Sequence, residues 1–144
     1  MTPLPPARTF EREQPVRVLV VDDHLILRSG LVEIINETHG LSVCGVAATS
    51  AEALQAAIDH QPDVVIIDIS LGLESGLDLV GPIKERCPDA KVLMLSGYDD
   101  PQLATEARRV GASGYVVKGG ATASLVSAVR RVAAGELHFT DPRE

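Results

Sequence analysis

Short apolar runs alternate along the chain with longer stretches in which apolar residues recur every three or four positions. The short runs are rich in Val, Ile and Leu and predict five strands, over residues 16–21, 41–47, 64–68, 91–96 and 114–118. The longer stretches have the spacing of amphipathic helices. They predict helices over 24–38, from Thr49 or Ser50 to the "HQPD" segment at 60–63, and over 76–87, 101–112 and 122–135. The segment "SLGLESG", from Ser70 to Gly76, reads as a Gly-rich loop.

Five strand-helix units in succession favour a parallel sheet with right-handed crossovers. The runs 18–21, 64–67 and 92–95 are almost unbroken Val, Ile, Leu and Met, which is typical of central strands that are covered on both faces. We therefore predict an α/β, doubly wound parallel sheet with helices on both faces, in which the strand order reverses beside the first strand. Ligands in such sheets bind outside the carboxyl ends of the strands, at the reversal.

Polar side chains follow four of the five predicted strands at that edge. Asp22 and Asp23 come after the first strand, Asp68 ends the third, Ser96 the fourth and Lys118 the fifth. Three carboxylates that meet must take up a proton or a cation, and oxygen ligands of this kind suit Mg²⁺. With an ammonium and a hydroxyl nearby, the set predicts an aspartyl-phosphate site. Taken singly, the aspartates could be helix caps, the lysine a solvated surface residue and the serine a turn residue.

Composition narrows the picture further. The chain has 144 residues, which suits one domain, and 45% are apolar but only 3% aromatic, so the core must be aliphatic. The net charge of −7 argues against direct contact with nucleic acid, which needs Lys and Arg. The chain has two cysteines, Cys44 and Cys87. They form no metal or redox motif and are expected to be reduced packing residues. No apolar run approaches the ~18 residues of a membrane span. We expect a cytoplasmic protein.

The chain resembles the receiver domain of bacterial two-component response regulators, and within it the NarL/FixJ (LuxR-type) subfamily. The resemblance covers residues 15–136 and rests on "VLVVDDH", "DVVIIDISL", "SGLDL", "VLMLSGY" and "GASGYVVKG", which occur in the family's order and spacing. It implies the flavodoxin-like receiver fold, with five strands in the order 2-1-3-4-5. We expect a flexible, Pro-rich tail over residues 1–15, the receiver over 16–136, and the start of a linker over 137–144.

The resemblance also implies an acceptor site and a metal site. Asp68 would receive a phosphoryl group from a phosphohistidine of a sensor histidine kinase. Asp23, Asp68 and the backbone carbonyl of Ser70 would bind Mg²⁺ directly, and Asp22 would act mainly through a metal-bound water. His24 is expected to begin the first helix, and to pack or cap there rather than bind metal.

A second group would convert phosphorylation into a change of shape. The resemblance implies that Lys118 pairs with the phosphoryl group, that Ser96 swings to hydrogen-bond it, and that Tyr115 turns inward as Ser96 moves. Ser70 and Tyr98 stand at the positions that tune dephosphorylation. Neither is a carboxylate or an amide that could orient a water, so we predict a slow-to-moderate autophosphatase.

Two departures from the family pattern stand out. Gly72 takes the place of a proline after the acceptor aspartate, and Gly119 and Gly120 follow Lys118. We expect the first departure to make the loop after Asp68 more flexible. Both keep open the alternative of a receiver-like module that binds partners without phosphorylation.

The resemblance implies partners beyond the kinase. Members of the subfamily bind DNA through a C-terminal helix-turn-helix domain that is absent from this chain, and a homodimer on phosphorylation is possible. Its surface, on the first and fifth helices or on the fourth helix to fifth helix face, stays open. We expect an excised receiver from a transcription regulator, with a stand-alone receiver as the alternative. A phosphatase that turns over on Asp68 would need a second acid-base carboxylate and a substrate pocket, and the sequence shows neither.

Overall fold

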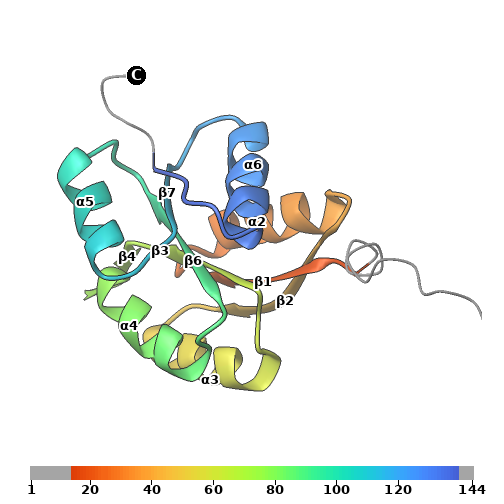
Figure 1. Ribbon diagram of the computed structural model, residues 1–144, viewed down its shortest axis with the longest axis horizontal. Helices are drawn as coiled ribbons and strands as arrows, with labels where there is room; N and C mark the ends of the chain where they lie inside the picture. Colours follow the sequence, from red (N-terminus) through yellow and green to blue (C-terminus); the bar gives the residue numbers. More distant parts are fainter. Residues whose placement is uncertain (1–13, 140–144) are drawn as a thin grey trace, which may run out of the picture.

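A twisted five-stranded sheet flanked by helices forms the body of the protein (Figure 1). The computed structural model describes residues 14–139, so most of the predicted tail, residues 1–13, and residues 140–144 of the predicted linker lie outside the described residues. The strands are β1 (Val16–Val21), β2 (Leu41–Ala47), β3 (Val64–Asp68), β4 (Ser70–Leu71), β5 (Glu74–Ser75), β6 (Lys91–Ser96) and β7 (Gly114–Val117). The helices are α2 (Leu25–Glu37), α3 (Ser50–His60), α4 (Leu77–Arg86), α5 (Pro101–Arg109) and α6 (Thr122–Ala133).

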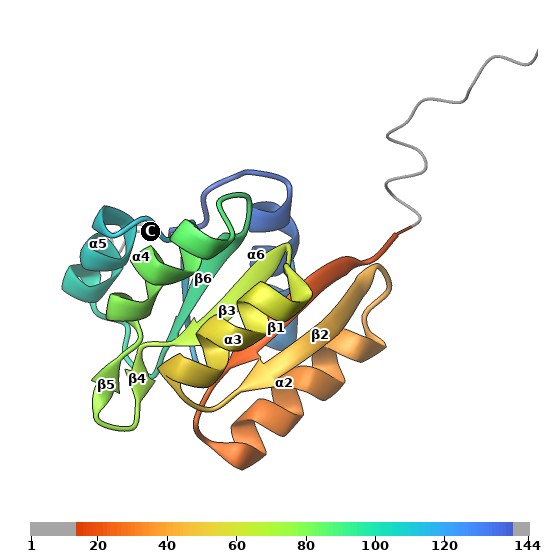
Figure 2. The ribbon, with the colours of Figure 1, turned by 90° about the horizontal axis from the view of Figure 1, so that it is seen from below.

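The main sheet has the order β2-β1-β3-β6-β7, and every neighbouring pair is parallel. Numbered by the five long strands alone, this is the predicted order 2-1-3-4-5, with the reversal beside β1. The predicted fold class is therefore confirmed. Because all five strands run the same way, their carboxyl ends share one edge, where the β4-β5 hairpin and the start of α2 also lie (Figure 2).

The sheet divides the core into two layers, with α3, α4 and α5 on one face and α2 and α6 on the other (Figures 1 and 2). Successive side chains of a strand point to opposite faces. In β3, Val65 and Ile67 join the first layer, whereas Val64 and Ile66 join the second, and all four are fully buried. Burial of each such side chain contributes about 1.5–3 kcal/mol, which explains why the central strands read as unbroken apolar runs.

The segment predicted as a Gly-rich loop folds into an antiparallel hairpin of β4 and β5. Ser70 pairs with Ser75 and Leu71 pairs with Glu74, which leaves Gly72 and Leu73 as a two-residue turn. Gly72 has a φ of 60°, and a glycine at the first turn position suits the type II′ turn that matches strand twist. The loop prediction was wrong here because the strands have only two residues each, too few to show an alternating pattern.

Two helix faces also differ from the periodic prediction. Leu27 and Ile58 share the helical spacing of their buried neighbours, but they are 48% and 47% exposed. Of the two predicted starts of α3, Thr49 caps the helix, since its hydroxyl accepts a hydrogen bond of 3.1 Å from the Glu52 backbone N–H. Both cysteines are free, as predicted, and burial raises the pKa of the Cys44 and Cys87 thiols, which favours the protonated form.

Residues 137–139 dock against the outer edge of β7, and we call them the C-terminal clasp. The His138 N–H donates to the Ser113 carbonyl at 2.8 Å, and its carbonyl accepts from the Tyr115 N–H at 3.0 Å. Phe139 packs on the core and lies 5.4 Å from the Arg108 guanidinium. The clasp thereby covers an edge strand that would otherwise present unpaired backbone groups.

We expect Phe139→Ala to lower the free energy of unfolding by about 1–2 kcal/mol, through lost apolar burial and lost cation-π contact. Urea denaturation checks this value. Leu137→Ala is the matched control, because Leu137 is half-exposed and its truncation should cost less than about 0.5 kcal/mol. Equal effects of the two substitutions would show that Phe139 is not anchored on the core.

Candidate functional site

The carboxyl edge of the sheet brings together residues that lie about fifty positions apart in sequence. The Lys118 ammonium, just beyond β7, donates to Asp68 Oδ2 at the end of β3 over 2.7 Å. The same nitrogen lies 3.7 Å from Asp22 Oδ2, which follows β1. The structure therefore places Lys118 between the two predicted aspartates, across the point where the strand order reverses.

Asp22 and Asp68 are buried carboxylates that backbone N–H groups hold in place. Their exposed fractions are 1% and 2%. The His24 N–H donates to Asp22 Oδ1 at 2.8 Å, and the Ser70 N–H donates to Asp68 Oδ1 at 3.0 Å. Each acid thus has one oxygen anchored to the backbone.

The second oxygen of Asp22 is unusual, because Asp22 Oδ2 is buried and has no hydrogen-bond partner among the described residues. An unsatisfied buried oxygen of a charged group is costly. The ammonium of Lys118, at 3.7 Å, is too distant for a hydrogen bond. The atom is therefore available to a cation or to a water molecule.

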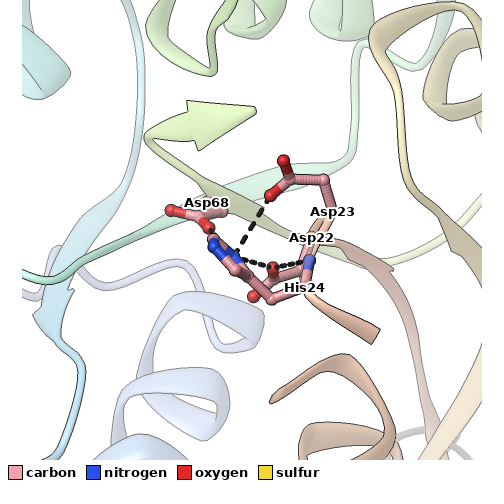
Figure 3. Close-up of side chains that lie close together, drawn as sticks. All are labelled: Asp22, Asp23, His24 and Asp68. Atoms are coloured by element: carbon pink, nitrogen blue, oxygen red, sulfur yellow. Dashed lines mark hydrogen bonds and ion pairs between the residues drawn. The ribbon is translucent and has the colours of Figure 1, made fainter. Parts of the chain in front are cut away.

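His24 turns its ring toward this group of acids (Figure 3). Its Nδ1 lies 3.1 Å from Asp22 Oδ1, 3.1 Å from Asp23 Oδ1 and 3.5 Å from Asp68 Oδ2. The residue does occupy the position before α2, but its side chain caps no backbone group there. His24 therefore begins α2 as predicted, but the predicted side-chain cap is wrong, because the ring lies against the acidic group instead.

The residues present fit a divalent cation. Asp22, Asp23, His24 and Asp68 each offer a ligand atom, and these atoms all lie within 4.8 Å of one another. The group holds three carboxylates, of which Lys118 pairs with Asp68 and lies near Asp22, and within residues 14–139 no donor hydrogen-bonds to Asp22 Oδ2. Oxygen ligands of this number and charge are those that Mg²⁺ and Ca²⁺ take in proteins.

Ser96 and Tyr115 lie on the neighbouring strands and are connected through Tyr98. The Ser96 hydroxyl is buried and accepts a 3.0 Å hydrogen bond from the Tyr98 N–H. The Tyr115 hydroxyl donates to the Tyr98 carbonyl. Any movement of the Ser96 hydroxyl therefore disturbs the same turn that holds the ring of Tyr115, which is 6% exposed.

Sequence reasoning therefore located the acids, the lysine, the serine and the tyrosine, but it missed the part played by His24 and by the hairpin. The signal for His24 was its place directly after two aspartates, at the end of a central strand.

Within residues 14–139, no helix is long and apolar enough to cross a membrane.

Known proteins share this fold. The family model of the response regulator receiver domain matches residues 18–130. The oxygen regulatory protein NreC of Staphylococcus carnosus is 39% identical over 129 residues, which are 89% of this chain and 59% of NreC. A LuxR-family two-component response regulator from Aurantimonas sp. SI85-9A1 is 31% identical, with a TM-score of 0.83 over 90% of this chain and 92% of that one.

A third similar structure contains a modified aspartate and a metal ion. It is a response regulator from Burkholderia pseudomallei "with a phosphorylated aspartic acid, calcium ion and citrate", 30% identical, with a TM-score of 0.73 over 83% of this chain and 69% of that one.

The doubly wound sheet and its acidic edge define a signalling receiver of the two-component type. This chain belongs to the response regulator receiver family, in its NarL/FixJ subfamily. The chain spans 59% of the length of the curated relative NreC.

Proposed function

We propose that this receiver accepts a phosphoryl group on Asp68 from a phosphohistidine of a sensor histidine kinase, and that the modification controls an effector. The observation that carries the proposal is the setting of Asp68. This buried carboxylate has Oδ1 anchored by the Ser70 N–H and Oδ2 held 2.7 Å from the Lys118 ammonium. The phosphorylated aspartate of the Burkholderia pseudomallei relative supports the same chemistry here.

The transfer needs only groups at this edge and the donor. An Asp68 oxygen supplies the electron pair for the new P–O bond, while the N–P bond of the phosphohistidine breaks and its pair stays on the imidazole nitrogen. The Lys118 ammonium stays beside the acceptor oxygen and stabilises the charge of the transferring group. When bound, Mg²⁺ would neutralise phosphoryl oxygens, held by Asp23, Asp68 and the carbonyl of Ser70, with Asp22 acting through a water.

The switch would follow from the link between Ser96 and Tyr115. A phosphoryl group on Asp68 offers acceptor oxygens that can draw the Ser96 hydroxyl away from the Tyr98 N–H. The Tyr98 carbonyl accepts the hydrogen bond of the Tyr115 hydroxyl. A shift of the Tyr98 turn would therefore release this hydroxyl or change its position. We infer that this rearranges the surface of α5, β7 and α6. A phosphorylation-dependent homodimer would use such a surface.

Exposed apolar side chains beside the acidic edge suit the docking of a kinase. Leu25 and Ile26, at the start of α2, are 65% and 85% exposed. They continue into a groove between α2 and α6 whose lining includes Leu27, Leu31 and Leu125. Such a patch on a domain of this size indicates a protein-binding surface. We assign it to the cytoplasmic part of the sensor kinase.

The output would be transcription. NreC is named as a regulatory protein, and the present chain corresponds to 59% of its length. We infer that a helix-turn-helix domain beyond residue 144 binds DNA and that residues 137–144 begin the linker to it. The net charge of −7 is consistent with DNA contact lying outside the receiver.

Phosphorylation of the chain by a small-molecule phosphodonor tests the proposal. We expect the chain, incubated with acetyl phosphate and Mg²⁺, to gain the mass of one phosphoryl group and to lose it on treatment with hydroxylamine, which cleaves acyl phosphates. The label should persist for longer than seconds, since neither Ser70 nor Tyr98 carries a carboxylate or an amide that could orient an attacking water. An unchanged mass would favour a phosphorylation-independent interaction module, and repeated turnover of the donor would favour a phosphatase.

A further inference from the structure

The acidic group consists of Asp22, Asp23, His24 and Asp68. Of these four residues, His24 offers a nitrogen as a metal ligand, whereas the others offer a carboxylate oxygen. Its ring is 55% exposed on its outer side, while Nδ1 faces inward to three carboxylates (Figure 3). Neither the fold nor the acceptor chemistry of Asp68 requires an imidazole there. Its side chain makes no capping bond to α2, so the start of the helix does not explain its orientation either.

The spacing of the four ligand atoms fits one metal ion. In octahedral coordination at ~2.1 Å, adjacent ligand atoms lie about 3.0 Å apart and opposite atoms about 4.2 Å apart. The His24 Nδ1 is 3.1 Å from Asp22 Oδ1, 3.1 Å from Asp23 Oδ1 and 3.5 Å from Asp68 Oδ2. These are the separations of adjacent ligands, and all ligand atoms of the group lie within 4.8 Å of one another.

A second observation points to a ligand at the same place. Asp22 is 1% exposed, and its Oδ2 has no hydrogen-bond partner among residues 14–139. A buried charged group with an unsatisfied oxygen needs a cation or a donor close by. The acidic group is therefore more than a collection of surface carboxylates.

We propose that the His24 Nδ1 is a nitrogen ligand of the divalent cation at this site, and that it shifts the preference of the site from Mg²⁺ toward transition metals such as Ni²⁺, Co²⁺ and Zn²⁺. Imidazole suits these ions, whereas Mg²⁺ prefers oxygen ligands and water. The inference rests on the metal site in the proposed function, and it adds a ligand and a selectivity to it.

The test is metal binding by the full 144-residue chain, measured by calorimetry with Ni²⁺ and with Mg²⁺ in separate titrations. We expect His24→Asn to weaken Ni²⁺ binding about tenfold or more, and to leave Mg²⁺ binding unchanged or tighter. Asparagine is a good residue before a helix, so the variant keeps the start of α2. His39→Asn is the matched control for stray histidine binding, because His39 is exposed and it is its backbone carbonyl, not its ring, that accepts from the Arg130 guanidinium.

Spectroscopy identifies the ligand directly. With Mn²⁺ as the probe, pulsed electron paramagnetic resonance should detect coupling to an imidazole nitrogen in the wild type and in His39→Asn, but not in His24→Asn. If Ni²⁺ and Mg²⁺ bind but neither the affinity nor the nitrogen coupling depends on His24, this inference is overturned while the oxygen site stands. If no divalent ion binds the wild type, the metal site of the proposed function falls with it.

Discussion

Replacing Asp68 with Asn is expected to abolish the uptake of a phosphoryl group. The amide has nearly the shape of the carboxylate, so its oxygen can still accept from the Ser70 N–H. An amide oxygen is too weak a nucleophile to form the acyl phosphate, and the pairing with the Lys118 ammonium loses its charge. The loss should therefore be complete rather than partial.

Intact-mass measurement after incubation with acetyl phosphate and Mg²⁺ checks this prediction. Asp89→Asn is the control, because Asp89 is an exposed aspartate in the turn between α4 and β6 and should leave labelling unchanged. Asp68→Asn should also unfold at the same urea concentration as the wild type or a higher one, since it removes one of three clustered negative charges. A phosphoryl group found on the folded Asn variant would place the acceptor elsewhere.

Replacing Gly76 with Ala is expected to have the largest effect on the fold around the site. Gly76 precedes α4, and its N–H donates to the Ile69 carbonyl at 2.6 Å. A Cβ at this position would overlap the carbonyl oxygen of Asp68 and lie 2.9 Å from Ile67 Cγ2. The obstructing oxygen belongs to the backbone of the central strand, so no side-chain rotation relieves the overlap. We expect a loss of about 1–3 kcal/mol or more in the free energy of unfolding.

The same substitution should slow phosphorylation, because a shift of the Asp68 backbone moves its carboxylate away from the Lys118 ammonium. Urea denaturation and the rate of labelling by acetyl phosphate measure the two effects. Gly81→Ala is the matched control: Gly81 lies inside α4, and a Cβ there meets no other part of the fold within 4 Å, so alanine should change stability by less than about 1 kcal/mol. A Gly76→Ala protein as stable as the wild type would contradict the crowding at this junction.

The fold was predictable because its signals are local and repeated. The central strands are apolar on both faces, so β3 shows an unbroken run from Val64 to Ile67 that ends in Asp68. Strands that alternate with helices must be parallel, and parallel strands put their carboxyl ends on one edge. From the parallel arrangement alone, Asp22, Asp68 and Lys118 are therefore expected to meet at that edge.

The hairpin and the outlying apolar residues were not predictable in this way. Strands of two residues carry no periodic signal, so β4 and β5 were read as a loop. Leu27 and Ile58 follow the helical period of their buried neighbours, yet they lie at the margins of their helix faces and remain about half exposed. Whether a periodic position is covered depends on which element lies against it.

The sequence by itself thus determined the parallel sheet, its order beside the first strand, and the convergence of the acids and the lysine. Only the tertiary structure decided the fine placement of side chains within that frame. It turned the ring of His24 toward Asp22, Asp23 and Asp68, and it pressed Gly76 against the Asp68 backbone. The physical reason is range: strand and helix patterns follow from neighbours in the chain, whereas a ring orientation or a backbone contact depends on atoms that packing alone brings together.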